Sequence, residues 1–287
     1  MKGWIVVNSF VNSLKFKELY NFFQRSAEKL KIQLEVRTTD SLICCINDSF
    51  QSFELPDFII FWDKDIYLAQ RLESLRIPLF NSARAIELCD NKILTALALN
   101  NKVAMPKTVI VPKTFENIGY NTFTFLEKAV KILGLPIIIK EAYGSFGQQV
   151  YIANTLEEGR KIFENIKFKD CLIQEFISSS YGKDIRINVV GNEVVASMLR
   201  YNSNDFRSNI SNGGSMKPFT PSNSQKEIAI EACKILGLTF AGVDVLFGDN
   251  DKPYICEVNS NPHFKTTFDC TGVDMSEKIL THIINTI

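Results

Sequence analysis

The chain has 287 residues, of which 46% are hydrophobic and 22% charged, so it can bury a large core and is long enough for two or three lobes. Its 32 basic and 32 acidic residues give a formal net charge of zero. This balance argues against a protein held mainly by nucleic-acid phosphates or by an anionic membrane.

Cysteine usage and hydropathy predict the compartment. Seven scattered cysteines without a C-x-x-C pair favour free thiols in a reducing cytoplasm over a disulfide framework. No signal peptide opens the chain, and no apolar run approaches the ~20 residues that cross a bilayer. We therefore expect a soluble cytoplasmic protein with no nucleic-acid or membrane partner.

The first 83 residues alternate between strand and helix patterns. These patterns predict strands at 4–7, 32–36, 58–62 and 78–80, with helices at 14–30 and 66–75. The alternation predicts a parallel, doubly wound sheet in an N-terminal α/β domain, residues 1–83. The first strand is not followed by a G-x-G-x-x-G pattern, so a substrate-side domain is favoured over a dinucleotide site.

A small α+β lobe and a largely antiparallel lobe are predicted to follow. We place the central lobe at residues 84–170, with helices from Ser82 and, capped by Asp90, at 91–101, a strand at 105–111, and a helix at 122–133. A β-β-α-β pattern comes next, at 135–140, 149–153, 155–165 and 171–177. We place the C-terminal lobe at residues 171–287, with strands 184–190 and 193–201, a hairpin, and helices 224–236 and 273–284.

The hairpin near the C-terminus brings acidic residues together. Its strands, 240–247 and 252–261, are joined by a polar turn. If the loop spans 249–252, Asp244 lies opposite Glu257, and the facing apolar pairs are Val243 with Val258, Val245 with Cys256, and Phe247 with Tyr254. Because side chains alternate along a strand, Glu257 and Asn259 share a face.

Opposed carboxylates repel one another, and a bound cation offsets that repulsion. Two carboxylates and an amide oxygen suit magnesium, which completes its octahedron with water and phosphate oxygens. Asp244, Glu257 and Asn259 are therefore candidate metal ligands. The alternative is an exposed hairpin with solvated acids.

Lys140 ends a run of three isoleucines and precedes the loop Gly144-Ser-Phe-Gly147. Its ammonium is either a snorkelling surface group or a charge aimed at an anionic ligand. The two glycines permit turns that point backbone N–H groups at phosphate oxygens, although the Gly-Lys-Ser/Thr of a P-loop is missing. A plain hairpin turn is the alternative for this loop.

Two strand segments carry polar groups suited to a cleft. Residues 174–177 form an edge segment that offers backbone groups to a purine, with Glu175 outward and Phe176 inward, or else an ordinary strand. On the strand at 184–190, one face carries polar side chains and suggests a cleft floor: Asp184, Arg186 and Asn188.

A glycine-punctuated loop before Gly213-Gly214 carries paired arginines and amides. Such groups suit a phosphoryl group or a carboxylate, with solvated surface arginines as the alternative. The residues concerned are Arg200, Arg207, Ser208 and Asn209.

The order of these pieces resembles the RimK-like branch of the ATP-grasp superfamily, the ribosomal-protein glutamate ligases and their relatives. The resemblance covers about residues 85–287, and its most specific segments are Asp205-Phe-Arg-Ser-Asn209 with Gly213-Gly214, Ala241-Gly-Val-Asp244 and Cys256-Glu-Val-Asn-Ser260. It implies an ATP-grasp fold of mixed α/β and α+β type, with a doubly wound pre-grasp domain, a small central lid lobe and an antiparallel-sheet C-terminal lobe.

The resemblance also implies roles for matching positions. The nucleotide residues it implies are Lys92 and Lys140 at the ATP phosphates, Gly144, Ser145 and Gly147 in a mobile lid, Glu175, Phe176 and Ile177 at the adenine hinge, Asp184 at the ribose, and Ser208 at the reacting phosphate. The catalytic residues it implies are Arg200, Arg207 and Asn209. Two magnesium ions, with manganese as the alternative, are implied at Asp244, Glu257 and Asn259.

The implied activity is an ATP-dependent ligase that joins a carboxylate to an amine through an acyl phosphate and releases ADP and phosphate. Amino acids or peptides are the implied substrates, and a homodimer or homotetramer is the expected assembly. The alternatives are an ATP-dependent phosphotransferase acting on a small acceptor and a non-catalytic nucleotide-binding module. The complete metal triplet argues against the module.

One segment departs from the family pattern. After Asn259, many such ligases have a small glycine-containing loop, whereas this chain continues through His263-Phe-Lys265. These bulky residues stand where the acceptor enters, so the resemblance does not fix the amine donor. It is glutamate, another amino acid, or a side chain of a peptide being cyclised. His263 either shapes a distinct pocket or is a hydrogen-bonded structural residue.

Overall fold

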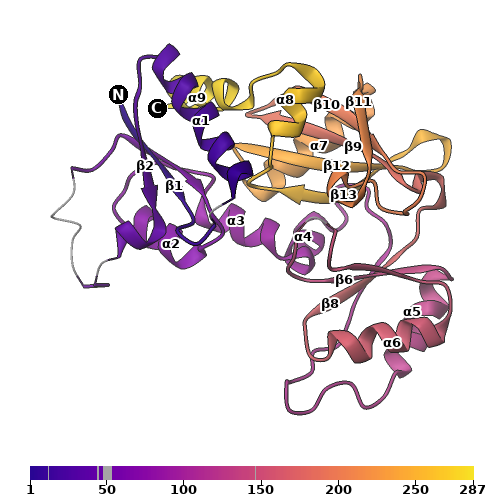
Figure 1. The fold of residues 1–287 in the computed structure, drawn as a ribbon. Coiled ribbons are helices and arrows are strands. Elements are labelled where there is room, and N and C mark those ends of the chain that lie inside the picture. The colour runs from indigo at the N-terminus through magenta and orange to yellow at the C-terminus, as the bar shows by residue number, and fades with distance from the viewer. Residues whose placement is uncertain (12, 44, 48–53, 146) are drawn as a thin grey trace.

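The computed structural model describes residues 1–11, 13–43, 45–47, 54–145 and 147–287, which form three sheets with helices packed on them (Figure 1). The N-terminal sheet is parallel, with the order β2-β1-β3-β4. Its strands are β1 (Lys2–Val7), β2 (Gln33–Thr38), β3 (Phe58–Trp62) and β4 (Leu79–Phe80), and its helices are α1 (Leu14–Lys29) and α2 (Ile66–Glu73).

Both faces of the N-terminal sheet are covered. In β3, Phe58, Ile60 and Trp62 pack in one cluster with residues of α1, whereas Ile59 and Phe61 pack in another with residues of α2. All five residues of this strand are buried, as expected for a parallel strand between two layers of helices. The doubly wound arrangement predicted from the sequence is therefore confirmed.

The central lobe is a four-stranded antiparallel sheet with the order β5-β8-β6-β7. Its elements are β5 (Thr108–Ile110), α5 (Thr124–Leu133), β6 (Ile137–Glu141), β7 (Val150–Ala153), α6 (Leu156–Ile166) and β8 (Cys171–Glu175). The two helices share a hydrophobic core with the sheet, and the lobe stands at the lower right of Figure 1. The β-β-α-β prediction is confirmed, although β5 is shorter than expected because Pro106 and Pro112 flank it.

The C-terminal lobe holds a five-stranded antiparallel sheet with the order β11-β10-β9-β12-β13. Its elements are β9 (Lys183–Val190), β10 (Glu193–Tyr201), β11 (Ser215–Pro218), α7 (Asn223–Leu236), β12 (Phe240–Phe247), β13 (Pro253–Asn259), α8 (Lys265–Thr271) and α9 (Met275–Thr286). Short 3-10 turns lie at Thr39–Leu42, Ser178–Ser180, Ile210–Asn212 and Asp249–Asp251. The sequence did not predict β11 or α8, which are short elements with weak periodicity.

The packing departs from the expected lobe boundaries at two places. Strand β8 pairs with β5 and β6, so it lies in the central sheet and not in a lobe that begins at residue 171. Helices α3 (Ala83–Asp90) and α4 (Lys92–Leu99) share a core cluster with the C-terminal sheet. Asn91, not Asp90, caps α4, because its Oδ1 accepts the N–H groups of Ile93 (2.9 Å) and Leu94 (3.2 Å).

The hairpin confirms that Asp244 lies opposite Glu257 and Val243 opposite Val258. The other predicted pairs were wrong, because Val245 lies opposite Ile255. The connection runs over residues 248–252, one residue more than expected, and a bulge beside Asp244 then restores the predicted pairing.

The N-terminal and C-terminal lobes share one hydrophobic core. Phe264 is fully buried there, with its ring 5.7 Å from Phe23 and 5.8 Å from both Phe22 and Trp62. Helices α1 and α9 also contact each other. This residue therefore fixes the segment after β13 to the N-terminal lobe and is not a pocket-lining group.

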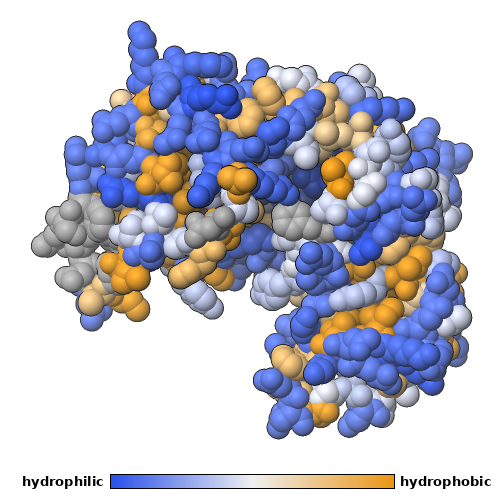
Figure 2. All heavy atoms as spheres, viewed as in Figure 1, coloured by the Kyte–Doolittle hydropathy of each residue, from blue (hydrophilic) through white to orange (hydrophobic). Residues whose placement is uncertain are grey.

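Hydrophilic residues cover most of the face shown in Figure 2, and hydrophobic residues gather there only in small groups. Within the described ranges, no helix combines the length and apolar character needed to cross a bilayer.

Candidate active site

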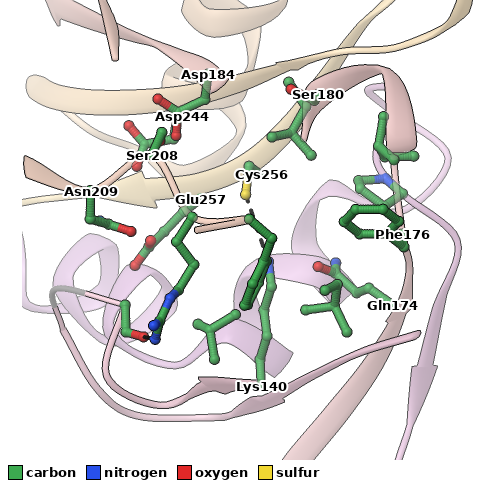
Figure 3. A pocket seen from close by; sticks show the side chains of 18 of the residues that line it. Lys140, Gln174, Phe176, Ser180, Asp184, Ser208, Asn209, Asp244, Cys256 and Glu257 are labelled. Carbon is green, nitrogen blue, oxygen red and sulfur yellow. Dashed lines mark hydrogen bonds between the residues drawn. The ribbon is translucent and has the colours of Figure 1, made fainter. Parts of the chain in front are cut away.

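A pocket of about 770 Å³ lies between the central sheet and the C-terminal sheet (Figure 3). Its lining includes most of the nucleotide and catalytic residues proposed from the sequence, namely Lys92, Lys140, Gly147, Glu175, Phe176, Ile177, Asp184, Arg200, Arg207, Ser208 and Asn209. Gly144 and Ser145 instead line a neighbouring pocket.

Two lysines line the floor of the pocket. Lys140, in β6, is 8% exposed and its Nζ lies 3.7 Å from Cys256 Sγ, so it is not a snorkelling surface group. Lys92, the first residue of α4, donates from Nζ to the carbonyl of Gly144 (3.1 Å). Burial lowers the pKa of Lys92, and Lys140 lowers it further, while Glu257 raises it. The paired ammonium groups suit an anionic ligand such as a phosphate chain.

The end of β8 forms one edge of the pocket. The Glu175 carboxylate accepts the N–H of Lys107 (2.7 Å), and the Glu175 N–H donates to the carbonyl of Lys107 (3.0 Å). Glu175 is thus occupied in holding the segment before β5, whereas Phe176 lines the pocket as predicted (Figure 3). Beyond Glu175 the chain leaves the sheet, and the carbonyl of Ile177 accepts the N–H of Ser180 (3.0 Å). The backbone of Phe176 has no partner strand there and can contact the edge of a planar ligand.

Four charged residues of the C-terminal sheet form a chain of buried ion pairs. Arg200 donates to both oxygens of Asp184 (2.7 and 2.6 Å) and lies 2.9 Å from Asp244. Arg186 also donates to both oxygens of Asp244. Burial alone would raise the pKa of Asp244, but Arg186 and Arg200 lower it, so the carboxylate stays ionised.

The ion-pair network gives Arg200 and Arg186 partners that the sequence did not predict. Arg200, proposed to contact the reacting phosphate, has its guanidinium bound between two carboxylates, which raise the pKa of Arg200 against the effect of its burial. Arg186 was not among the proposed site residues, although the sequence placed it on the same strand face as Asp184. The sequence did not show that β9 pairs with β12, and this pairing brings Arg186 opposite Asp244. Asn188, on that same face, is covered by α8, where it donates to Thr267 (3.2 Å).

The lid loop contacts the arginine-bearing loop. Arg207 donates to the carbonyl of Gly147 (2.8 Å) and is held by Asp205, which raises the pKa of Arg207. Gly147 has a φ of +73°, and a Cβ added there would lie 2.7 Å from the Asn209 side chain. The positive φ favours glycine at this position, and a larger residue would also displace the Asn209 side chain. Phe146, in the middle of the loop, lies outside the described residues.

The proposed metal ligands lie together but differ in their partners. Asp244 and Glu257 are cross-strand neighbours, and Figure 3 shows both on the side of the pocket where Ser208 and Asn209 lie. No hydrogen bond or ion pair joins the Glu257 carboxylate to another described residue. The Asn259 amide donates to the carbonyl of Gly242 (3.5 Å), which leaves its oxygen for a ligand. Two carboxylates and an amide oxygen fit magnesium, which takes few protein ligands. In the described part of the chain, no site is formed by three or more His, Cys, Asp or Glu side chains.

A second pocket of about 1140 Å³ adjoins the first on the side of the N-terminal lobe. Glu257 lines both pockets, whereas Asn259 and His263 line the second. His263 Nε2 lies 3.2 Å from the carbonyl oxygen of Lys15, so this nitrogen carries the proton and donates. Lys265 pairs with Asp269 (2.6 Å) on the exposed face of α8.

We expect His263 to make folding pH-dependent. Burial, followed by the charge of Lys15, lowers the pKa of His263 to about 4 from its ordinary 6.5. As pH falls from about 6.5 toward about 4, the unfolded chain takes up a proton first, so the free energy of unfolding decreases. A His263→Gln variant should lose less stability over this interval in urea titrations at several pH values. An unchanged pH dependence would contradict this.

Comparisons with known proteins show the family of this chain. The model of the RimK-like ATP-grasp domain matches residues 89–283. An uncharacterized protein of Mycoplasma pneumoniae is 32% identical over 243 residues, which cover 82% of this chain and 83% of that protein. A probable alpha-L-glutamate ligase of Maridesulfovibrio salexigens is 32% identical over 221 residues, covering 75% and 70%.

The fold is also shared by a solved structure. The D-alanine–D-alanine ligase from Bacillus anthracis, complexed with ATP, superposes with a TM-score of 0.74 at 18% identity, covering 100% of this chain and 97% of that one. The superposition shows a shared fold, while the family model and the two relatives show the protein family. The chain therefore belongs to the RimK-like ATP-grasp family of ATP-dependent carboxylate–amine ligases.

Proposed function

We propose that this chain ligates an amino acid or peptide at the boundary of its two pockets, with ATP in the first pocket and the substrates in the second. The observation that supports this is the position of Glu257, which lines both pockets and has no cation paired with it among the described residues. A triphosphate held at Glu257 and Asp244 would end where the second pocket begins.

The proposed nucleotide contacts follow from the lining of the first pocket. Lys92 and Lys140 would neutralise the phosphates, and the segment at Phe176 and Ile177 would contact the adenine. Asp184 would contact the ribose, because a carboxylate has about four lone-pair positions and Arg200 uses only two of them. Two magnesium ions held by Asp244, Glu257 and Asn259 would offset the negative charge of the phosphates.

The proposed reaction has two steps. A carboxylate oxygen attacks the γ-phosphorus of ATP, the bond to the ADP oxygen breaks, and an acyl phosphate forms. The amine nitrogen then attacks the acyl carbon, the bond to the phosphate oxygen breaks, and the nitrogen gives up a proton to phosphate or water. Arg207 and Asn209, beside the lid, would stabilise the charge that gathers on the transferred group. Contact between the lid and these residues would exclude water from the acyl phosphate.

A screen of ADP release tests this function. The chain is incubated with ATP, magnesium and pairs of amino acids or short peptides, and the products are identified by mass spectrometry. ADP release that depends on both substrates, with an amide product, would support the ligase. A stable phosphorylated acceptor formed without any amine would show a phosphotransferase instead.

We expect Lys140→Ala to weaken ATP binding roughly 10- to 100-fold, because a charge-assisted contact to phosphate contributes about 1.5–3 kcal/mol. Calorimetric titration with a non-hydrolysable ATP analogue measures the change. Lys131→Ala, at an exposed position of α5, is the matched control and should bind as the parent does. Equal affinity in both variants would remove Lys140 from the site.

A further inference from the structure

The second pocket lies between the N-terminal lobe and the segment that follows β13. Three aromatic side chains of the N-terminal lobe line it, namely Phe16, Tyr20 and Trp62. Asn261 and His263 line it from the other side. These two residues belong to the segment that follows β13.

Both Asn261 and His263 present an unused hydrogen-bond acceptor. The Asn261 amide nitrogen donates to the carbonyl of Asp63 (2.8 Å), which fixes the amide so that Oδ1 is its acceptor. His263 donates from Nε2 to Lys15, which leaves Nδ1 as a lone pair. Oδ1 of Asn261 and Nδ1 of His263 are buried and have no hydrogen-bond partner among the described residues. Buried acceptors of this kind call for a donor.

The same pocket is lined by the carboxylate of Asp63, whose backbone carbonyl accepts from Asn261. Asp63 is 8% exposed, lines the same pocket, and uses Oδ1 to accept the N–H groups of Lys64 (2.7 Å) and Asp65 (2.9 Å). Among the described residues, no lysine, arginine or histidine forms an ion pair with it. Its charge raises the pKa of Tyr20, after the larger effect of burial.

The cations near this pocket are already paired. Lys64 forms an ion pair with Asp90, and Arg186 forms one with Asp244. Lys15 and Lys265 lie near His263 without lining the pocket, and they favour its neutral form. Among the described residues that line this pocket, Asp63 of the N-terminal lobe and Glu257 of β13 therefore carry charges without an ion-pair partner, and His263 acts as an acceptor.

We propose that Asp63, Asn261 and His263 form a recess that binds the amine substrate as its primary ammonium, which loses one proton to water before the nitrogen attacks. A primary ammonium has three N–H donors, and the recess offers one carboxylate and two neutral acceptors. The aromatic rings of Trp62, Tyr20 and Phe16 line the same pocket, and such rings attract cations. The inference rests on the proposed ligase function, because it makes the second pocket the place where the amine enters.

The recess is tested with a small probe, n-butylammonium chloride, and a matched anion, sodium butyrate. The chain contains only two histidines, His263 and His282, so its imidazole nitrogens can be followed by long-range proton–nitrogen NMR after nitrogen-15 labelling. We expect n-butylammonium to shift the Nδ1 resonance of His263 saturably, because a donor approaches its lone pair. Butyrate should leave it unmoved, and His282 should respond to neither.

The variant Asp63→Asn keeps the shape and the acceptor of Asp63 but removes its charge. We expect its affinity for n-butylammonium to fall at least about tenfold in the same titration, because a charge-assisted hydrogen bond is lost. Asp57→Asn, at an exposed position of the same lobe, is the control and should bind the probe as the parent does.

Two outcomes would overturn the recess. One is an Nδ1 resonance of His263 that n-butylammonium does not shift, or that butyrate shifts equally. The other is equal probe affinity in Asp63→Asn and the parent. Both outcomes are measured by NMR titration and do not require a ligation reaction. Absence of ADP release with every substrate pair would refute the ligase function instead, and normal release without probe binding would overturn the recess alone.

Discussion

Glu257→Gln is expected to reduce ATP turnover by roughly 100-fold or more while the fold is retained. The change replaces a carboxylate oxygen by an amide nitrogen at the residue that borders both pockets. Charge neutralisation by a bound metal contributes several kcal/mol, and each 1.36 kcal/mol is about tenfold in rate. The measurement is magnesium-dependent ADP release, with circular dichroism to confirm the fold.

The control for this substitution is Glu193→Gln, at the exposed first residue of β10 in the same sheet. It makes the same chemical change outside the pockets and should leave turnover unaltered. Substantial residual turnover in Glu257→Gln would count heavily against the metal assignment. A large loss in both variants would point to a general effect of charge.

Arg200→Met is expected to destabilise the fold by about 3–5 kcal/mol, because removing one partner of a buried ion pair leaves Asp184 uncompensated, whereas Asp244 keeps Arg186. Arg200 is 5% exposed and is bound by Asp184 and Asp244. Methionine keeps most of the side-chain length, so the change reports mainly on charge. Urea denaturation followed by circular dichroism measures the difference.

The matched control is Arg84→Met, because Arg84 also forms an ion pair, with Glu87, but its side chain is 69% exposed. Exposed pairs contribute only ~0–1 kcal/mol, so this variant should unfold close to the parent. Equal urea midpoints for the two variants would show that the buried network is not important for stability.

The ion-pair network also bears on how a metal would bind. Asp244 is contacted by Arg186 from the side of the second pocket and by Arg200 from the side of the first. Because the carboxylate has further lone-pair positions, it can bind a cation without releasing both arginines. The two guanidinium groups keep Asp244 ionised and would hold it in place for the ion.

The hairpin shows how far sequence reasoning reached within the site. The alternation of β-branched, aromatic and acidic residues predicted the two strands, and an assumed loop over residues 249–252 placed Asp244 opposite Glu257, a pair that the structure confirms. The assumed loop length was one residue too short, however, and a bulge compensated for the difference. A bulge depends on how a strand fits its neighbours, so its position could not be read from local pattern.

Periodicity and turn residues by themselves determined the order of strands and helices, the parallel N-terminal sheet and the motif order that identifies the family. Only the tertiary structure decided that Arg186 and Arg200 both bind Asp244. It also decided that Phe264 belongs to the shared core and that Asn261 and His263 keep acceptors without a partner among the described residues. The strands and helices follow from residues that are close along the chain. Contacts such as the hydrogen bond from Asn261 to Asp63 join residues far apart in the sequence, and the packing of two lobes brings these residues together.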